Sequence, residues 1–171
     1  MTVKEEGIIH RLPSFVWQYV ASTEMLPRWN PAIRRIFPKS QGPFRPHFEF
    51  DVTLAGQNGG EHEYNAEVAE FVEHRRIVFK MRSKTDPSIP ESTEIITLSP
   101  IVKGTKIERF TEIYAKEKTI SWWAKLLMRI FGRFRKQQAE VKSGETLKRL
   151  AQLVEQNSKP SGLTLRSRTR R

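Results

Sequence analysis

Apolar and polar residues alternate with a period of two through the middle of the chain. Within residues 47–54 the apolar side chains hold every second position: Phe48, Phe50, Val52 and Leu54. Because successive side chains of a strand point to opposite faces, this pattern predicts an antiparallel strand with one buried face. Asn58-Gly59 follows and supplies the positive φ angles of a hairpin turn.

The same alternation predicts a set of further strands over residues 62–72, 75–82, 93–101 and 106–114. In the first of these the pattern slips toward Phe71, which indicates a β-bulge. Lys103-Gly104 is the predicted turn between the last two strands. Together with two strands predicted in the first forty residues, these segments predict a sheet of about six or seven antiparallel strands.

The first forty residues predict a strand, two short helices and a second strand. Residues 8–12 are the predicted opening strand, and Pro13-Ser14 then starts a helix whose apolar residues recur at helical spacing. Pro27 and Pro31 prevent a long helix in the next segment, so a second short helix or a tight turn is expected there. Residues 33–38 are the predicted second strand.

A helical period begins near Trp122. One stripe is apolar: Trp122, Trp123, Leu126, Leu127, Ile130, Phe131 and Phe134. The opposite side carries only cations: Lys125, Arg129, Arg133 and Lys136. The apolar series continues to about Gln156, which predicts one long helix, and residues 157–171 lack the apolar mass to fold alone and are expected to be disordered.

Composition limits the possible functions. A chain of 171 residues suits a single domain, and the absence of cysteine excludes disulfides, thiolate metal sites and a cysteine nucleophile. The net charge of +11 is concentrated near the C-terminus, since residues 119–139 and 159–171 each hold five cations and no acid. Neither a secretory signal nor a membrane-spanning segment is recognised, so a cytoplasmic protein is expected.

The segment Pro13-Ser-Phe-Val-Trp-Gln-Tyr-Val20, leading into Leu26-Pro-Arg-Trp-Asn-Pro31, resembles the SRPBCC superfamily. This superfamily includes START lipid-binding domains, birch-pollen-allergen-like proteins and polyketide cyclases/dehydrases. Arg75-Arg-Ile-Val-Phe79 and the closing Leu147-Lys-Arg-Leu-Ala-Gln-Leu-Val-Glu155 are weaker matches. The resemblance covers about residues 8–156 and implies an α+β helix-grip fold, in which a curved antiparallel sheet wraps around a long C-terminal helix. The domain is expected to span residues 1–156.

The resemblance also implies a cavity between the concave face of the sheet and the long helix. Apolar pockets of this kind hold ligands when a few polar groups orient them. The candidate ligand-binding residues are Trp29, Phe50, Val52, Tyr64, Phe79, Met81, Ile96, Leu98, Arg109, Trp123 and Leu127. For any single apolar member, packing in a core is the more frequent role.

Polar candidates inside that cavity are few. Arg109 alternates with Ile107 and would be a polar group on the concave face, but the opposite register, with Arg109 on the surface, is the favoured interpretation. His47, Glu49 and Asp51 share one strand face and could surround a metal ion or a proton, yet that face is predicted to point to solvent. No metal, no cofactor and no catalytic residue is predicted.

Three functions remain. The first is binding or transport of a small hydrophobic or amphipathic ligand, such as a lipid, sterol or polyketide-like molecule. The second is a cyclase/dehydrase (aromatase) type of enzyme, which needs a titrating group inside the cavity; an inward Arg109 or Tyr64 would favour it. The third is contact with an anionic membrane surface, or with nucleic acid as the less favoured partner, through the tail and the helix that begins near Trp122. Its candidate contact residues are Trp122 of the apolar stripe and Lys125, Arg129, Arg133 and Lys136 of the basic face.

Overall fold

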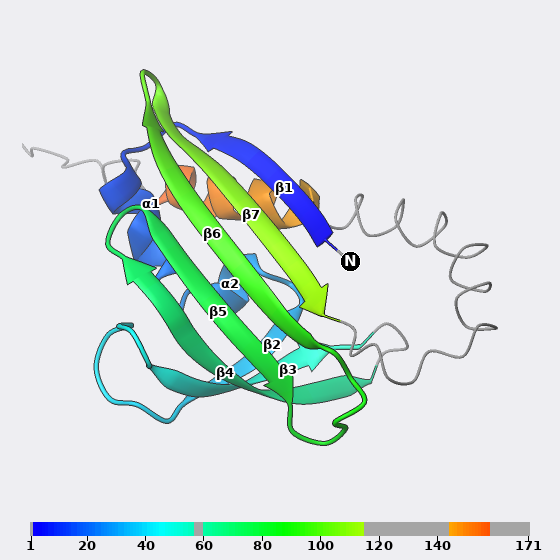
Figure 1. Cartoon of the computed structure of the whole chain (residues 1–171). Coiled ribbons are helices and arrows are strands. Elements are labelled where there is room, and N and C mark those ends of the chain that lie inside the picture. Colours follow the sequence, from blue (N-terminus) through cyan, green and yellow to red (C-terminus); the bar gives the residue numbers. More distant parts are fainter. Residues whose placement is uncertain (1, 57–59, 115–143, 158–171) are drawn as a thin grey trace, which may run out of the picture.

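The computed structural model describes residues 2–56, 60–114 and 144–157 (Figure 1). Seven strands form one antiparallel sheet in the order β1-β7-β6-β5-β4-β3-β2. Their bounds are β1 Thr2–Ile9, β2 Ile33–Pro38, β3 Glu49–Ala55, β4 Glu61–Val72, β5 Arg76–Ser83, β6 Glu91–Ile101 and β7 Gly104–Tyr114. The helices α1 (Pro13–Val20) and α2 (Leu26–Trp29) lie between β1 and β2. This architecture confirms the predicted α+β helix-grip fold.

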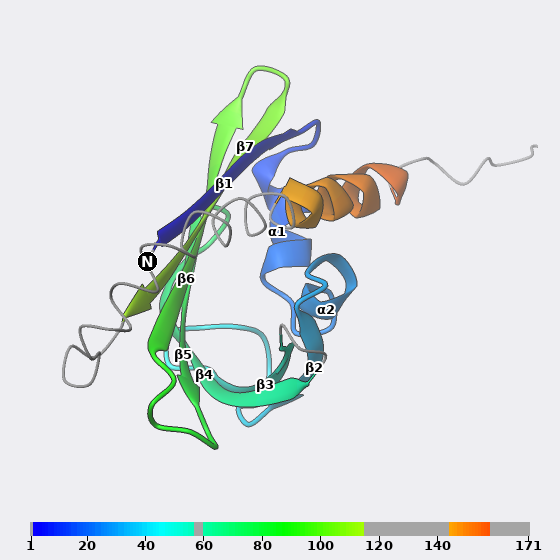
Figure 2. The ribbon, with the colours of Figure 1, turned by 90° about the vertical axis from the view of Figure 1, so that its right-hand side faces the viewer.

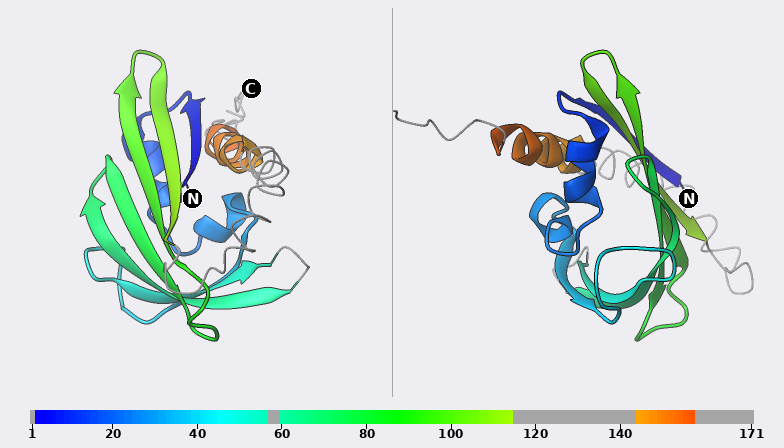
Figure 3. Two further views of the ribbon diagram at one scale, coloured as in Figure 1. Left: turned by 45° about the vertical axis from the view of Figure 1, so that its right-hand side comes forward. Right: turned by 90° about the vertical axis from the view of Figure 1, so that its left-hand side faces the viewer.

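The sheet is strongly curved, and the helices lie on its concave side (Figures 2 and 3). β1, β7 and β6 form one wall, while β4, β3 and β2 curl beneath α1 and α2. A C-terminal helix of residues 144–156 lies on the same side, with Leu147, Leu150 and Val154 buried. A Cβ atom placed on Gly7 of β1 would lie 3.7 Å from Leu147 Cδ1, so this helix packs directly over β1.

The first strand was predicted over residues 8–12, and its observed bounds are different. β1 instead begins at Thr2 and ends at Ile9, paired along its whole length with β7 from Thr2↔Glu112 to Ile9↔Thr105. The charged run Lys4-Glu5-Glu6 hides the alternation, and the pairing partner lies about a hundred residues away in sequence. The predicted strand ended too late because Leu12 caps α1, whose first residue is Pro13.

A β-bulge and a turn lie where the sequence predicted them. The predicted bulge is confirmed, since the register of β4 on β5 shifts between Val68 and Glu70 and brings Phe71 opposite Ile77. Gly104 begins β7 with φ +142°, and a Cβ atom there would lie only 2.2 Å from the carbonyl oxygen of Ile9. Glycine is required at this position because any side chain would collide with the backbone of β1.

Candidate functional site

The concave face of the sheet carries the apolar residues that alternation predicted. Five of the candidate ligand-binding residues are buried there: Phe50, Val52, Phe79, Ile96 and Leu98. Tyr64 and Met81 are half-buried beside them and pack against the same core. The structure therefore brings these seven side chains onto one surface, and their contact with a ligand stays a prediction.

Part of this surface is filled by an aromatic side chain from a loop. Phe44, in the connection between β2 and β3, is almost fully buried. Its ring centroid lies 5.0 Å from that of Phe48, 5.6 Å from Phe50 and 5.5 Å from Phe79. Tilted and edge-on rings at these separations attract each other beyond the area they bury. The β3 end of the concave face is therefore packed as a core.

Trp29 is fully buried at the end of α2. Its indole Nε1–H donates a hydrogen bond of 3.0 Å to the carbonyl oxygen of Tyr19 in α1. This bond satisfies the one polar atom of the ring, so Trp29 ties the two short helices together. A ligand contact by Trp29 stays a prediction.

Arg109 lies on the concave face, and the favoured interpretation as a surface residue was wrong. It pairs with Ile96 of β6 and with Glu5 of β1, both of which point inward. Phe110 and Tyr114 obscured the alternation because these apolar residues face outward, beside charged Glu108 and Glu112. The structure thus selects the register in which an arginine lies among apolar neighbours.

Arg109 holds two carboxylates from neighbouring strands. Its Nε donates to Glu94 Oε1 at 2.7 Å and its Nη1 donates to Glu5 Oε2 at 3.1 Å. The side chains of Glu5, Glu94 and Arg109 are 4%, 10% and 13% exposed, respectively. We call these three residues the buried charged cluster. Along the described lengths of β1, β6 and β7, they are the only charged residues on the concave face.

The buried charged cluster keeps Arg109 protonated. Burial alone would lower the pKa of its guanidinium, but attraction to Glu94 and then to Glu5 raises that pKa above its ordinary value. Among the described residues, the second oxygen of Glu5, Oε1, forms no hydrogen bond, although this atom is buried. A buried polar atom without a partner costs free energy, so the cluster is incomplete.

Sequence reasoning missed Glu5 and Glu94. Glu5 lay outside the predicted first strand, so its face was not considered. Glu94 precedes Ile96 by two residues, and this spacing places it on the inner face of β6. Opposite charges at inward positions of neighbouring strands were therefore the available signal, but recognising them required the β1–β7 pairing.

The outer face of the same sheet is charged and open to water. His47, Glu49 and Asp51 lie on it as predicted, and Asp51 pairs with Lys39 at 2.8 Å and Lys84 at 3.1 Å. Within the described ranges, no group of three His, Asp or Glu residues is arranged to hold a metal ion. The absence of a metal and of a cofactor stays a prediction.

A groove of about 620 Å³ crosses this outer face. It is formed by residues 65–67, 80–82 and 91–93 of three adjacent strands, together with Lys39, Glu49 and Tyr114. Its three cations are balanced by three carboxylates, and Arg82 pairs with Glu91 at 2.9 Å. The groove therefore offers no excess charge to a ligand, and the concave face is the stronger candidate site.

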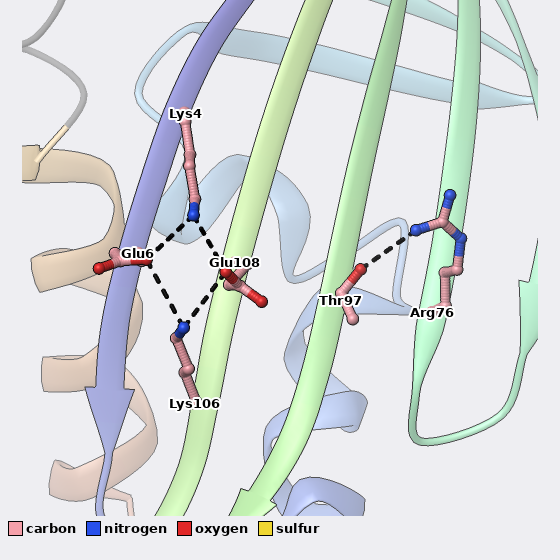
Figure 4. A network of polar contacts seen from close by, with 6 residues as sticks. All are labelled: Lys4, Glu6, Arg76, Thr97, Lys106 and Glu108. Atoms are coloured by element: carbon pink, nitrogen blue, oxygen red, sulfur yellow. Dashed lines mark hydrogen bonds and ion pairs between the residues drawn. The ribbon is translucent and has the colours of Figure 1, made fainter.

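Ion pairs also lie on the outer face of β1 and β7. Lys4 contacts Glu6 and Glu108 at 3.2 Å each, and Lys106 contacts the same two carboxylates at 3.6 and 3.3 Å (Figure 4). On β5, Arg76 donates to Thr97 at 3.3 Å. On β1 and β7 the residues of these ion pairs alternate with Glu5 and Arg109 of the buried charged cluster, so these two strands present ion pairs on both faces.

Several predicted contact residues lie outside the described residues. They are the ligand candidates Trp123 and Leu127, the membrane candidates Trp122, Lys125, Arg129, Arg133 and Lys136, and residues 158–171 of the predicted tail. None of the helices that the structure describes is both long and apolar enough to cross a membrane. A cytoplasmic location and a peripheral membrane contact stay predictions.

Comparison with known proteins gives a family and a fold. The family model described as "Activator of Hsp90 ATPase homolog 1-like protein" matches residues 12–155. A search of curated proteins finds no match.

Solved structures support the same architecture. TTHA0849 from Thermus thermophilus aligns with a TM-score of 0.67 at 16% identity, over 92% of this chain and 99% of that chain. Ara h 8.0201 aligns with a TM-score of 0.61 at 15% identity, over 92% and 99% of the two chains. DynU16, a protein in the dynemicin biosynthetic locus, aligns at 0.62 and 13% identity, over 91% of this chain and 48% of that one.

These similarities confirm the resemblance found in the sequence. The matched range begins just before α1 and ends within the C-terminal helix, so it spans nearly the whole helix-grip domain. The chain belongs to the family of activator of Hsp90 ATPase homolog 1-like proteins, within the SRPBCC superfamily.

Proposed function

We propose that the protein binds a small amphipathic ligand, of lipid, sterol or polyketide-like size, on the concave face of its sheet. The observation that carries this proposal is the buried charged cluster beside an apolar surface. Ligand sites in proteins combine an apolar lining with a few polar groups that fix orientation. The half-buried Tyr64 and Met81 add an apolar surface that is not fully covered by the core.

Stability alone gives no reason to keep three charges on this face. Replacing a buried ion pair by apolar residues of similar size is often neutral or stabilising, because desolvation offsets the attraction between the charges. Recognition of a ligand gives such a reason. Apolar ligand area would supply affinity at about 25 cal/mol per Å², before the cost of association is subtracted.

Native mass spectrometry of the protein purified from cells tests this function. We expect a bound small molecule, released on denaturation and identified after extraction. Met81→Trp, which fills the concave face, should lose it. Lys80→Trp is the matched control because Lys80 is the neighbouring residue on the outer, exposed face. A ligand-free protein that also binds no apolar probe would overturn the proposal.

A second candidate is an enzyme of the cyclase/dehydrase type. Tyr64 favours it, because the side chain lies on the concave face and burial raises the pKa of its hydroxyl. The hydroxyl is protonated at neutral pH, as in an ordinary tyrosine, and can donate a hydrogen bond to a carbonyl group. Incubation with a linear poly-β-ketone thioester tests it: Tyr64→Phe should retain binding and lose turnover, and the absence of turnover in the unaltered protein would reject it.

A further inference from the structure

The buried charged cluster has properties that narrow the class of ligand. We propose that it binds the polar end of the ligand and selects a cationic group, such as a protonated amine. This inference rests on the proposed function, since it concerns the same concave face. It assigns Glu5 as the residue that contacts the cation, and Arg109 as the residue that positions Glu5.

The free oxygen of Glu5 marks the binding point. Oε2 of its carboxylate is held by Arg109 at 3.1 Å, which fixes the orientation of the group. Oε1 has no donor among the described residues and is buried. A ligand N–H placed there would complete the hydrogen bonding of a carboxylate already removed from water, and charge-assisted bonds of this kind are the strong ones.

The charge of the cluster favours a cation over a neutral or anionic group. One guanidinium faces two carboxylates, so the cluster carries a net charge of −1 when all three groups are ionised. Thr111, the inward residue beside Glu94, adds no charge. An ammonium group would bring the total to zero, whereas a carboxylate would add a second excess negative charge in a water-poor region.

The position of the cluster fits the end of an elongated ligand. Ile96 and Ile107 flank Arg109 on the inner face, one across the β6–β7 pairing and one two residues back along β7. Inward side chains two residues apart on a strand lie about 7 Å from each other. Both isoleucines are fully buried in the core, so an alkyl chain whose nitrogen reaches Glu5 would contact them by displacing part of the packing that covers them.

The positive net charge of the whole protein opposes the binding of a cation, so a preference for a cationic ligand is not explained by it. At +11, the chain attracts anions non-specifically and repels cations. Tighter binding of a cation therefore reports on a local site, because the overall field acts in the opposite direction.

Isothermal titration calorimetry with three probes of equal chain length tests the inference. We would titrate decylamine, decanol and decanoate into the full chain at pH 7, below the concentration at which each probe aggregates. Decylamine should bind about tenfold more tightly than decanol, the effect of one hydrogen bond to a charged group, and decanoate should bind most weakly.

Two isoelectronic substitutions distinguish the effect of Glu5 on decylamine binding from the effect of the protein's overall charge. Glu5→Gln should reduce decylamine binding to the level of decanol. Glu6→Gln removes the same charge from the neighbouring residue, whose side chain is 56% exposed on the outer face, and should leave the preference unchanged (Figure 4). Circular dichroism verifies that both variants fold. The comparison of the three probes on the unaltered protein stands even if Glu5→Gln fails to fold.

The outcomes distinguish this inference from the proposed function. Equal affinity for the three probes, or tightest binding of decanoate, would overturn the cationic preference and leave ligand binding intact. An equal loss of the preference in both variants would assign it to overall charge and overturn the role of Glu5. Failure of all three probes to bind would overturn the cationic preference, and together with a ligand-free purified protein it would overturn the proposed function as well.

Discussion

β1 and β7 carry ion pairs on both faces of the sheet, and the two faces place them in different surroundings. Glu5 and Arg109 point inward with exposed fractions of 4% and 13%. Glu6 and Lys106, on the same two strands, point outward at 56% and 41%. The residue types are similar, so the difference between the two sets lies in their access to water.

This difference determines what each set contributes. Pairs in water gain little, because solvent and salt screen the attraction and the side chains lose freedom. Pairs removed from water are strong only while every member is present, since an unpaired buried charge is costly. The ion pairs on the outer face therefore contribute to solubility and strand pairing. The buried charged cluster instead places polar groups on an apolar surface.

Removing Arg109 should produce the largest difference between the faces. Arg109→Met leaves two buried carboxylates without their cation, so the free energy of unfolding should fall by about 3–5 kcal/mol. Lys106→Met, the matched change on the outer face of β7, should cost less than about 1 kcal/mol. Urea unfolding measures the free energy of unfolding of both variants. Similar losses for the two would show that the buried charged cluster is not shielded from water.

Replacing the whole cluster should have a smaller effect of the opposite sign. A Glu5→Leu/Glu94→Leu/Arg109→Met variant removes all three charges together. It should be as stable as the unaltered protein, or more stable by about 1–4 kcal/mol. The same variant should lose any preference for decylamine. A large loss of stability in urea would instead assign the cluster a structural role.

The smallest effect concerns pH on the outer face. The pKa of Asp51 is lowered from its ordinary value of 3.8, chiefly by its hydrogen bond to Lys39 and also by Lys84. The stability that Asp51 contributes is therefore present above pH 3.8 and is lost as the pH falls through the lower folded-state pKa.

Asp51→Asn should accordingly cost less than about 1 kcal/mol at pH 7 and flatten the acid side of the stability profile. Thermal unfolding between pH 2 and 7 measures this dependence. A variant whose profile coincides with that of the unaltered protein would show that the outer pair contributes nothing.

Most of the sheet could be predicted from local pattern. The strand expected over residues 33–38 coincides with β2, and the alternation of Phe48, Phe50 and Val52 correctly assigned the inner face of β3 and of the residue before it. The alternation of apolar and polar residues identifies the strand there because one face of the sheet is buried and the other is exposed to solvent. Phe44 escaped prediction because it lies in a Gly/Pro-rich connection without any period.

The polar part of the candidate site could not be predicted in the same way. Glu5 and Arg109 are separated by 104 positions and meet only through the pairing of β1 with β7. Each is an ordinary charged residue in its own segment. Their importance comes from meeting on a buried face, which is a property of the tertiary structure.

Methyl-labelled NMR of the isoleucine side chains tests the central claim most directly, because it locates a bound ligand. Ile96 and Ile107 are buried beside Arg109, whereas Ile8 and Ile101 are exposed. On titration with decanol or decylamine, we predict that the methyl signals of Ile96 and Ile107 shift and saturate while those of Ile8 and Ile101 stay in place. Shifts confined to the exposed isoleucines, or no shifts at all, would contradict ligand binding on the concave face.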